Sequence, residues 1–113
     1  MKVKIDTREK FHVIKIQEPV LAANMTADIE NCLLPLLESS IKNVVLNCQD
    51  IQTIELAAAE TIVRLQQSFY ENDASFVICE LNQDIEEALD HAILCYHTPP
   101  VWDTIELWHI LVH

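Results

Sequence analysis

Residues 43–60 constrain the fold more than any other stretch of the chain. They open with Val44-Val45-Leu46, an apolar run that is not interrupted by polar residues. Such a run is typical of a strand that is covered on both faces, as in the parallel sheets of α/β proteins. A polar crossing follows, and from position 56 onward apolar residues return at the spacing of a helix that packs on a sheet. The stretch therefore predicts a strand over 41–48 and a helix over 56–70.

Three further strands are expected around this unit. The alternating residues at 2–6 and the segment at 11–18 suit the two arms of a hairpin, and the apolar run within 75–81 suits a buried strand. The strand–helix–strand order between residues 43 and 81 implies parallel neighbours joined by a right-handed crossover.

Three further helices are predicted from the helical spacing of apolar residues, over 26–40, around 85–92 and near 101–112. Pro35 lies inside the first of them and should kink or loosen it, because proline cannot donate the backbone hydrogen bond of a helix interior. The expected order of elements is ββαβαβαα, in one domain over residues 1–113. This pattern predicts an α/β fold.

The charge balance excludes two classes of partner. The chain carries seven basic and eighteen acidic residues, for a formal net charge of −11. Nucleic acids and anionic membrane surfaces would be repelled by such a surface, because both are bound mainly through lysine and arginine. No apolar run approaches the roughly 18 residues that span a bilayer, and residues 1–6 lack the apolar core of a signal peptide. We expect a cytoplasmic protein whose protein partner presents basic or apolar surface.

The absence of glycine excludes the phosphate-binding loops that depend on it. Neither a GxGxxG motif nor a Walker loop can be built from a chain with no glycine. Turns that need a positive φ must use asparagine or aspartate instead, and Asn72-Asp73 and Asn82-Gln83 are the expected places.

Metal-binding and catalytic arrangements are weak in this sequence. Glu87 and His91 are i, i+4 neighbours that could share a metal, but a solvated acidic face with one paired histidine is the favoured interpretation. His109 and His113 have the same spacing close to the chain end, where we expect fraying. No Ser-His-Asp or Cys-His arrangement can be assembled, so we expect no catalytic residue, no metal and no cofactor.

The four cysteines are widely spaced and form no CxxC pair. We interpret them as buried, reduced thiols that act as small hydrophobic residues. Cys48 and Cys79 fall in two predicted strands and could lie close together, but a disulfide is not expected in a reducing cytoplasm.

The order and spacing of these segments resemble the STAS domain of bacterial anti-sigma-factor antagonists. In that family the central strand leads to an Asp-Ser-Ser-Gly motif at the start of the next helix, and its first serine is the phosphorylation switch. The corresponding residues here are Glu55, Leu56, Ala57 and Ala58. The resemblance implies a small mixed β-sheet with about four helices mainly on one side. Two shorter segments, 22–25 and 98–105, also resemble family motifs.

The resemblance implies a partner-binding surface with no phosphorylation site. Leu56 occupies the position of the phosphorylated serine and has no hydroxyl. In STAS antagonists this region contacts an anti-sigma factor with a kinase-like fold. The residues implied here are Asn24, Met25, Glu55, Leu56, Ala57, Ala58 and Glu60.

Two function classes remain open at this stage. The first is a non-catalytic regulatory module that resembles an anti-sigma-factor antagonist but lacks the phosphorylatable serine. The alternative is a small-ligand-binding or enzyme-accessory α/β domain. For Leu56 itself, burial in the core is an alternative to partner binding. The oligomeric state stays undetermined.

Overall fold

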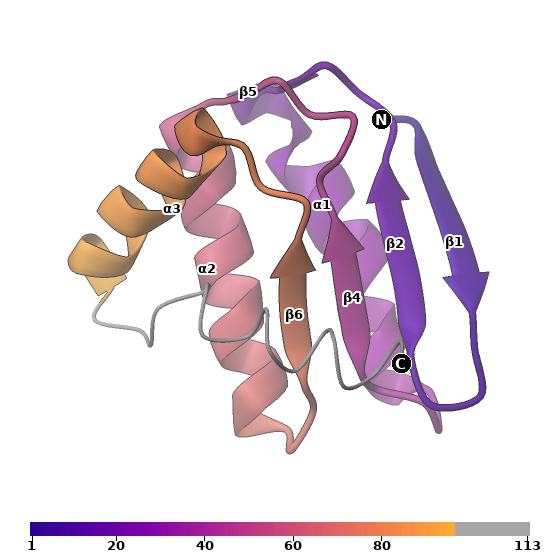
Figure 1. Cartoon of the computed structure of the whole chain (residues 1–113). Helices are drawn as coiled ribbons and strands as arrows, with labels where there is room; N and C mark the ends of the chain where they lie inside the picture. Colours follow the sequence, from indigo (N-terminus) through magenta and orange to yellow (C-terminus); the bar gives the residue numbers. More distant parts are fainter. Residues whose placement is uncertain (97–113) are drawn as a thin grey trace.

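A computed structural model of the protein describes residues 1–96, with side chains described up to residue 92. Its centre is a four-stranded mixed sheet with the strand order β1-β2-β4-β6 (Figure 1). The first two strands pair antiparallel, as the predicted hairpin requires, and the other neighbours pair parallel. The strands are β1 (Val3–Thr7), β2 (His12–Ile16), β4 (Val44–Asn47) and β6 (Phe76–Cys79).

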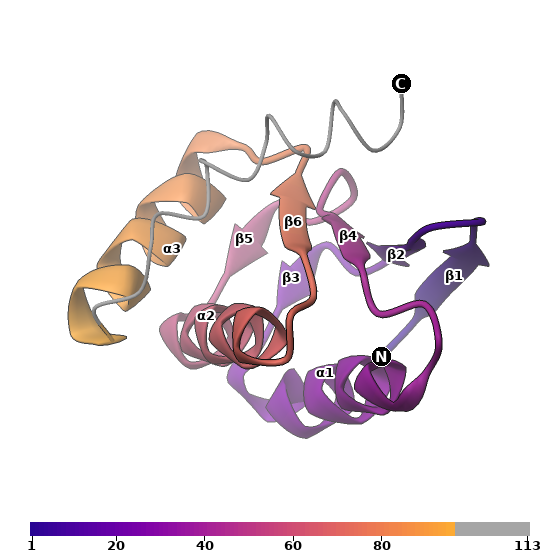
Figure 2. The same cartoon turned by 90° about the horizontal axis from the view of Figure 1, so that it is seen from below.

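Three α-helices accompany the sheet: α1 (Thr26–Leu33), α2 (Leu56–Glu71) and α3 (Gln83–Tyr96). Helices α1 and α2 cover one face of the sheet, and α3 lies beside α2, beyond the β6 edge (Figure 2). The small mixed sheet with helices mainly on one side is therefore confirmed. The helix predicted near 101–112 lies outside the described residues.

The single helix predicted over 26–40 is wrong in its second half. The α-helix ends at Leu33, and the chain continues as the 3₁₀ segment η2 (Leu34–Glu38), with Pro35 in its first turn. Proline has no N–H to donate to the preceding turn and its ring clashes with that turn's carbonyl, so the α-helix stops there. The first turn of a new helical segment tolerates it.

A second, two-stranded sheet was not predicted. Strands β3 (Val20–Leu21) and β5 (Thr53–Ile54) pair parallel, with Val20 opposite Thr53. The expected order ββαβαβαα therefore lacks two strands. Strands of two residues are too short to show a period of two, and their pairing joins segments that are far apart in the chain.

The central strand contributes to two apolar clusters, one on each face of the sheet. Val44 and Leu46 belong to the main core beneath the helices, whereas Val45 packs with Phe11 and Val77 on the opposite face. Successive side chains of a strand point to opposite faces, so burial on both sides explains the uninterrupted apolar run.

The left-handed turn positions are only partly as predicted. Asp73 has a φ of 59°, which confirms the turn at Asn72-Asp73. The second such residue of the described chain is Glu80, also at 59°, so the prediction at Asn82-Gln83 is wrong. Asn82 instead accepts a hydrogen bond from the Ile85 N–H through its Oδ1 (2.9 Å). This is the geometry of a helix N-cap, which asparagine favours.

Cys48 and Cys79 lie on neighbouring segments but face opposite sides of the sheet. The Cys48 N–H donates to the Cys79 carbonyl (3.0 Å), yet Cys48 belongs to the main core and Cys79 to the opposite cluster. Both thiols are free, and burial raises the pKa of each to about 12. These two cysteines are therefore inert structural residues, as expected.

Candidate partner-binding site

The backbone of Glu55 forms the turn that starts α2. Its conformation is extended (φ −82°, ψ 151°), and its carbonyl accepts from the N–H groups of Ala58 and Ala59, each at 3.1 Å. Its own N–H donates to the Leu21 carbonyl of β3 (2.9 Å). The start of α2 is thus held at the end of the small sheet.

The side chain of Glu55 ties two segments together instead of capping its own helix. Its Oε1 accepts a hydrogen bond from the Ala23 N–H (3.1 Å), at the start of the 3₁₀ turn η1 (Ala23–Met25). The carboxylate also lies at the N-terminus of α2, where the helix dipole favours negative charge. The residues at 22–25 and 55–60 therefore lie together at one corner of the molecule.

Leu56 is the most prominent apolar side chain at this corner. It is 44 % exposed, although it opens a helix whose following turns are buried. The alternative that Leu56 belongs to the core is therefore wrong. Ala57 and Asn24 are also exposed, and Met25 and Glu60 are half-buried.

Ala58 requires a correction to the implied surface. Its side chain is fully buried in the main core, so it cannot touch a partner directly. A residue one turn into α2 faces the sheet, and a small side chain lets the helix approach closely. The remaining implied residues keep some exposed surface.

Val20 was missed by the sequence interpretation. It lies on β3, is 44 % exposed and pairs with Thr53, two residues before Glu55. Its neighbour Leu21 is completely buried, so the pair shows the one-out, one-in alternation of a strand. The sequence interpretation ended the preceding strand at residue 18 and placed no further strand before the first helix.

The loop that leads into α2 is anchored by α3. The Nδ2 of Asn82 donates to the carbonyls of Ile51 (3.1 Å) and Gln52 (3.0 Å), while its Oδ1 caps α3. The Gln52 N–H in turn donates to the Pro19 carbonyl (2.8 Å). One amide side chain therefore couples the first turn of α3 to the loop beside the corner.

Two threonines lie near the position of the family's phosphorylated serine. Thr61 is buried, and its hydroxyl donates to the Ala57 carbonyl (2.9 Å), so a kinase could not reach it without unfolding α2. Thr53 is exposed on β5.

The metal-binding alternative gains no support from the described residues. No three histidine, cysteine, aspartate or glutamate side chains gather there in a way that could hold a metal ion. Glu87 accepts a hydrogen bond from Gln83 (3.1 Å), and His91 is exposed. His109 and His113 lie outside the described residues.

The family assignment comes from a match that covers almost the whole sequence. The family described as "STAS domain" matches residues 2–107. The chain belongs to the STAS family. Among curated proteins, none matches the sequence.

Solved structures with the same fold include bacterial regulators and part of a transporter. A putative anti-sigma factor antagonist from Thermotoga maritima has a TM-score of 0.67 at 14% identity, covering 83% of this chain and 80% of that one. An RsbS variant from Moorella thermoacetica has a TM-score of 0.68 at 13% identity, covering 81% and 78%. The murine Solute Carrier 26 family member A9 anion transporter has a TM-score of 0.59 at 7% identity, covering 72% of this chain and 13% of the transporter.

At 7–14% identity, these solved structures show that the chain shares their fold. The described part of the chain contains no helix that is long and apolar enough to cross a membrane.

Proposed function

We propose that this chain is a non-catalytic regulatory module of the anti-sigma-factor-antagonist type, which binds a protein partner in the cytoplasm without control by phosphorylation. The observation that carries the proposal is the exposure of Leu56 at the first position of α2, where the family has its phosphorylated serine. An apolar side chain there can contact a partner permanently, whereas a phosphoserine would add about −1.5 to −2 charges.

The side chains at and beside the corner indicate what kind of surface a partner should present. Leu56 and Val20 supply exposed apolar surface, and Ala57 leaves room for close approach. Glu55 and Glu60 add carboxylates at the edge of this surface. An apolar centre with a charged rim is the usual anatomy of a protein interface. The fitting partner therefore presents an apolar projection surrounded by basic residues, and an anti-sigma factor with a kinase-like fold is the candidate that the family suggests.

The small-ligand alternative has less support from the described residues. A pocket of about 120 Å³ lies on the outer face of the sheet, lined by Lys4, Asp6, Val13, Lys15 and Asn47. Typical small-molecule sites have volumes of about 300 Å³ or more. This pocket is too small for most metabolites.

The test is affinity capture from the native cell, followed by a binding titration of the captured partner. Leu56→Asp removes the apolar contact and introduces a charge at the family's switch position. We expect binding to weaken by about 1–3 kcal/mol, as for a central interface residue. Leu34→Asp is the matched control, because Leu34 is 41 % exposed and opens η2, outside the proposed corner. Equal binding by the two variants would refute the proposed surface.

Thermal unfolding of both variants separates lost binding from lost folding. Full burial of a leucine contributes about 1.5–3 kcal/mol, and Leu56 is close to half-exposed, so the substitution should cost about 1 kcal/mol of stability. An aspartate in the first turn of α2 recovers about 0.3–1 kcal/mol through the helix dipole. A variant that unfolds at ambient temperature would show that its weaker binding reflects lost folding and not a lost contact.

A further inference from the structure

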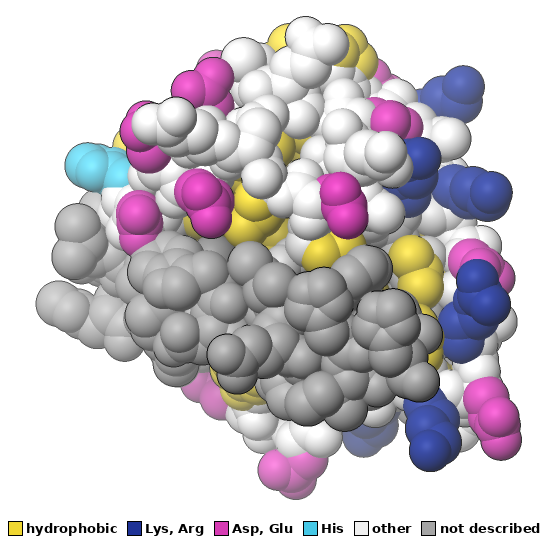
Figure 3. Space-filling view, in the orientation of Figure 1, with side chains coloured by type: hydrophobic (Ala, Val, Ile, Leu, Met, Phe, Trp, Pro, Cys, Tyr) yellow, Lys and Arg dark blue, Asp and Glu magenta, His cyan; other side chains and the backbone are white. Residues whose placement is uncertain are grey.

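The basic residues of this acidic protein are concentrated in one hairpin. Five of its seven lysines and arginines lie within residues 2–15, that is, just before β1, on β1 or β2, or in the turn between them. In Figure 3 the lysine and arginine side chains gather over this side of the molecule. We call these five residues the hairpin patch: Lys2, Lys4, Arg8, Lys10 and Lys15.

The opposite side of the molecule is acidic. Residues 51–96 contain nine aspartates and glutamates and a single basic residue, Arg64. Four of these acids are exposed on the first two turns of α3, on the opposite side of the sheet from the hairpin in both Figure 1 and Figure 2. We call them the helix patch: Asp84, Glu86, Glu87 and Asp90.

Most of these charges have no ionic partner within the described chain. In the hairpin patch, Arg8 pairs with Asp6 (2.8 Å) and Lys15 with Asp50 (3.7 Å), and the other three lysines form no ion pair with any residue that the structure describes. No ion pair of the described residues reaches the helix patch. One molecule cannot bring its own two patches together, because the sheet separates them.

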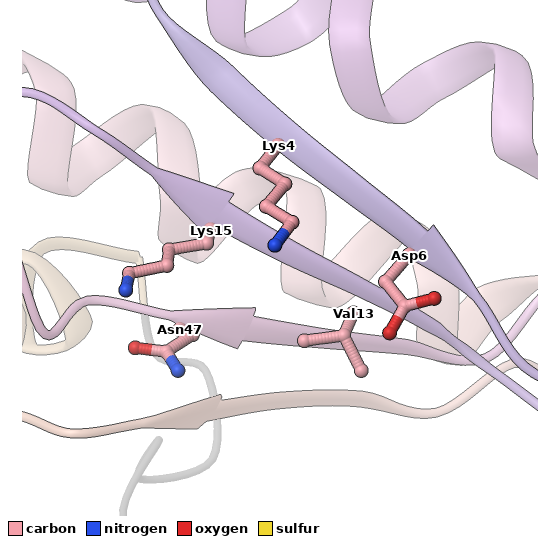
Figure 4. Close-up of a pocket in the computed structure, with 5 residues that line it drawn as sticks. All are labelled: Lys4, Asp6, Val13, Lys15 and Asn47. Carbon is pink, nitrogen blue, oxygen red and sulfur yellow. The ribbon is translucent and has the colours of Figure 1, made fainter.

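The hairpin also forms a recess lined by two of its lysines. Lys4 and Lys15 are direct cross-strand neighbours, and Asn47 is the next residue in the same row on β4. With Val13 and Asp6 they line the pocket of about 120 Å³ on the outer face of the sheet (Figure 4). Like charges directly opposite each other destabilise a sheet unless an anion lies between them.

We propose that copies of this chain associate head to tail, with the hairpin patch of one copy on the helix patch of the next. Charge complementarity selects this occupant, since the helix patch is the complementary surface that the molecule itself provides. Repulsion between the net charges of two copies decays over about 10 Å at 0.1 M salt, so the facing patches decide the contact.

Edge-strand lysines have a second known role that needs no partner. They discourage edge-to-edge pairing of sheets, and β1 is such an edge, with Ile5 exposed on it. That role makes no use of the helix patch. If the lysines only protect the sheet edge, substitutions in the helix patch should not change self-association, whereas the proposed contact requires that they weaken it.

The test is sedimentation equilibrium of the whole chain over about 1–500 µM, at about 0.1 M and about 1 M salt, where the screening length falls to about 3 Å. We expect self-association at the lower salt concentration and its loss at the higher one. A chain that stays monomeric at every concentration in low salt would overturn the proposal.

Two charge reversals locate the contact. Lys4→Glu and Asp90→Lys should each weaken association about tenfold at low salt, which corresponds to about 1.4 kcal/mol. Arg64→Glu and Glu38→Lys change the net charge equally at exposed sites outside both patches, and should change association less than twofold. Asp90→Lys is the more informative substitution. It reduces the net negative charge and so the general repulsion between copies, which without a specific contact would strengthen association. Equal effects of variants and controls would contradict the proposal.

A mixture of Lys4→Glu and Asp90→Lys chains adds a test that depends on the head-to-tail geometry. Each variant keeps one intact patch, and the two intact patches are complementary. The mixture should therefore form dimers of one copy of each variant with close to the original affinity, while each variant alone associates about tenfold more weakly. Failure of the mixture to associate would refute the contact.

Discussion

The side chain of Asn82 provides a quantitative test of how α3 supports the proposed partner-binding corner. Replacing Asn82 by alanine removes three hydrogen bonds: the cap on the Ile85 N–H and the two bonds to the Ile51 and Gln52 carbonyls. Loss of an asparagine N-cap costs about 1 kcal/mol. Each bond to the exposed loop should contribute about 0.5 kcal/mol, at the low end of the usual range.

We therefore expect Asn82→Ala to lower the free energy of unfolding by about 2 kcal/mol. For a domain of this size that corresponds to a fall in Tm of roughly 8 °C. Asn82→Asp keeps an acceptor for the Ile85 N–H and places a negative charge at the start of α3, which the helix dipole favours. It loses only the two bonds to the loop, so it should cost about 1 kcal/mol.

The measurement is urea unfolding followed by circular dichroism, combined with amide hydrogen exchange. Asn31→Ala is the control, because Asn31 is exposed within α1 and alanine is the better helix former there. It should leave stability unchanged or slightly higher.

Hydrogen exchange assigns the loss to its cause. Exchange at Gln52 should accelerate in both Asn82 variants, because both lose the bonds that anchor the loop. Exchange at Ile85 should accelerate only in Asn82→Ala. If the Ile85 amide exchanges at the same rate in the alanine and aspartate variants, the side chain at position 82 does not cap α3 in the way proposed.

Four further predictions concern the thiols, the hydroxyls and metal. Native alkylation should modify Cys32, which is half-buried, well before Cys48 and Cys79, whose pKa values are raised to about 12 by burial; equal rates read by peptide mass spectrometry would contradict this. Because the unfolded thiols ionise near their ordinary value of 9.0, stability should fall as pH rises from about 9 to 12, measured by urea unfolding against pH. Incubation with ATP and a cognate kinase should leave Thr53 and Thr61 unmodified, and stoichiometric phosphate by intact mass would disprove the absence of a switch. Protein purified without added metal should contain no stoichiometric zinc, which elemental analysis after dialysis can check.

The sequence by itself determined the elements that depend on local pattern. The uninterrupted run at Val44-Val45-Leu46 indicated a strand buried on both faces, and the structure places these residues in two apolar clusters. The spacing from Leu56 indicated α2 to within one residue of its end. Both signals are periodicities of neighbouring residues, and such periods follow directly from helix and strand geometry.

Only the tertiary structure decided how the candidate site is built. The pairing of β3 with β5 and the bond from the Ala23 N–H to Glu55 each join segments about 30 residues apart in the chain. Short contacts of this kind leave no periodic trace, because their energy comes from the packing that brings the segments together. The same packing buries Ala58 and leaves Ala57, its neighbour in an all-alanine run, exposed.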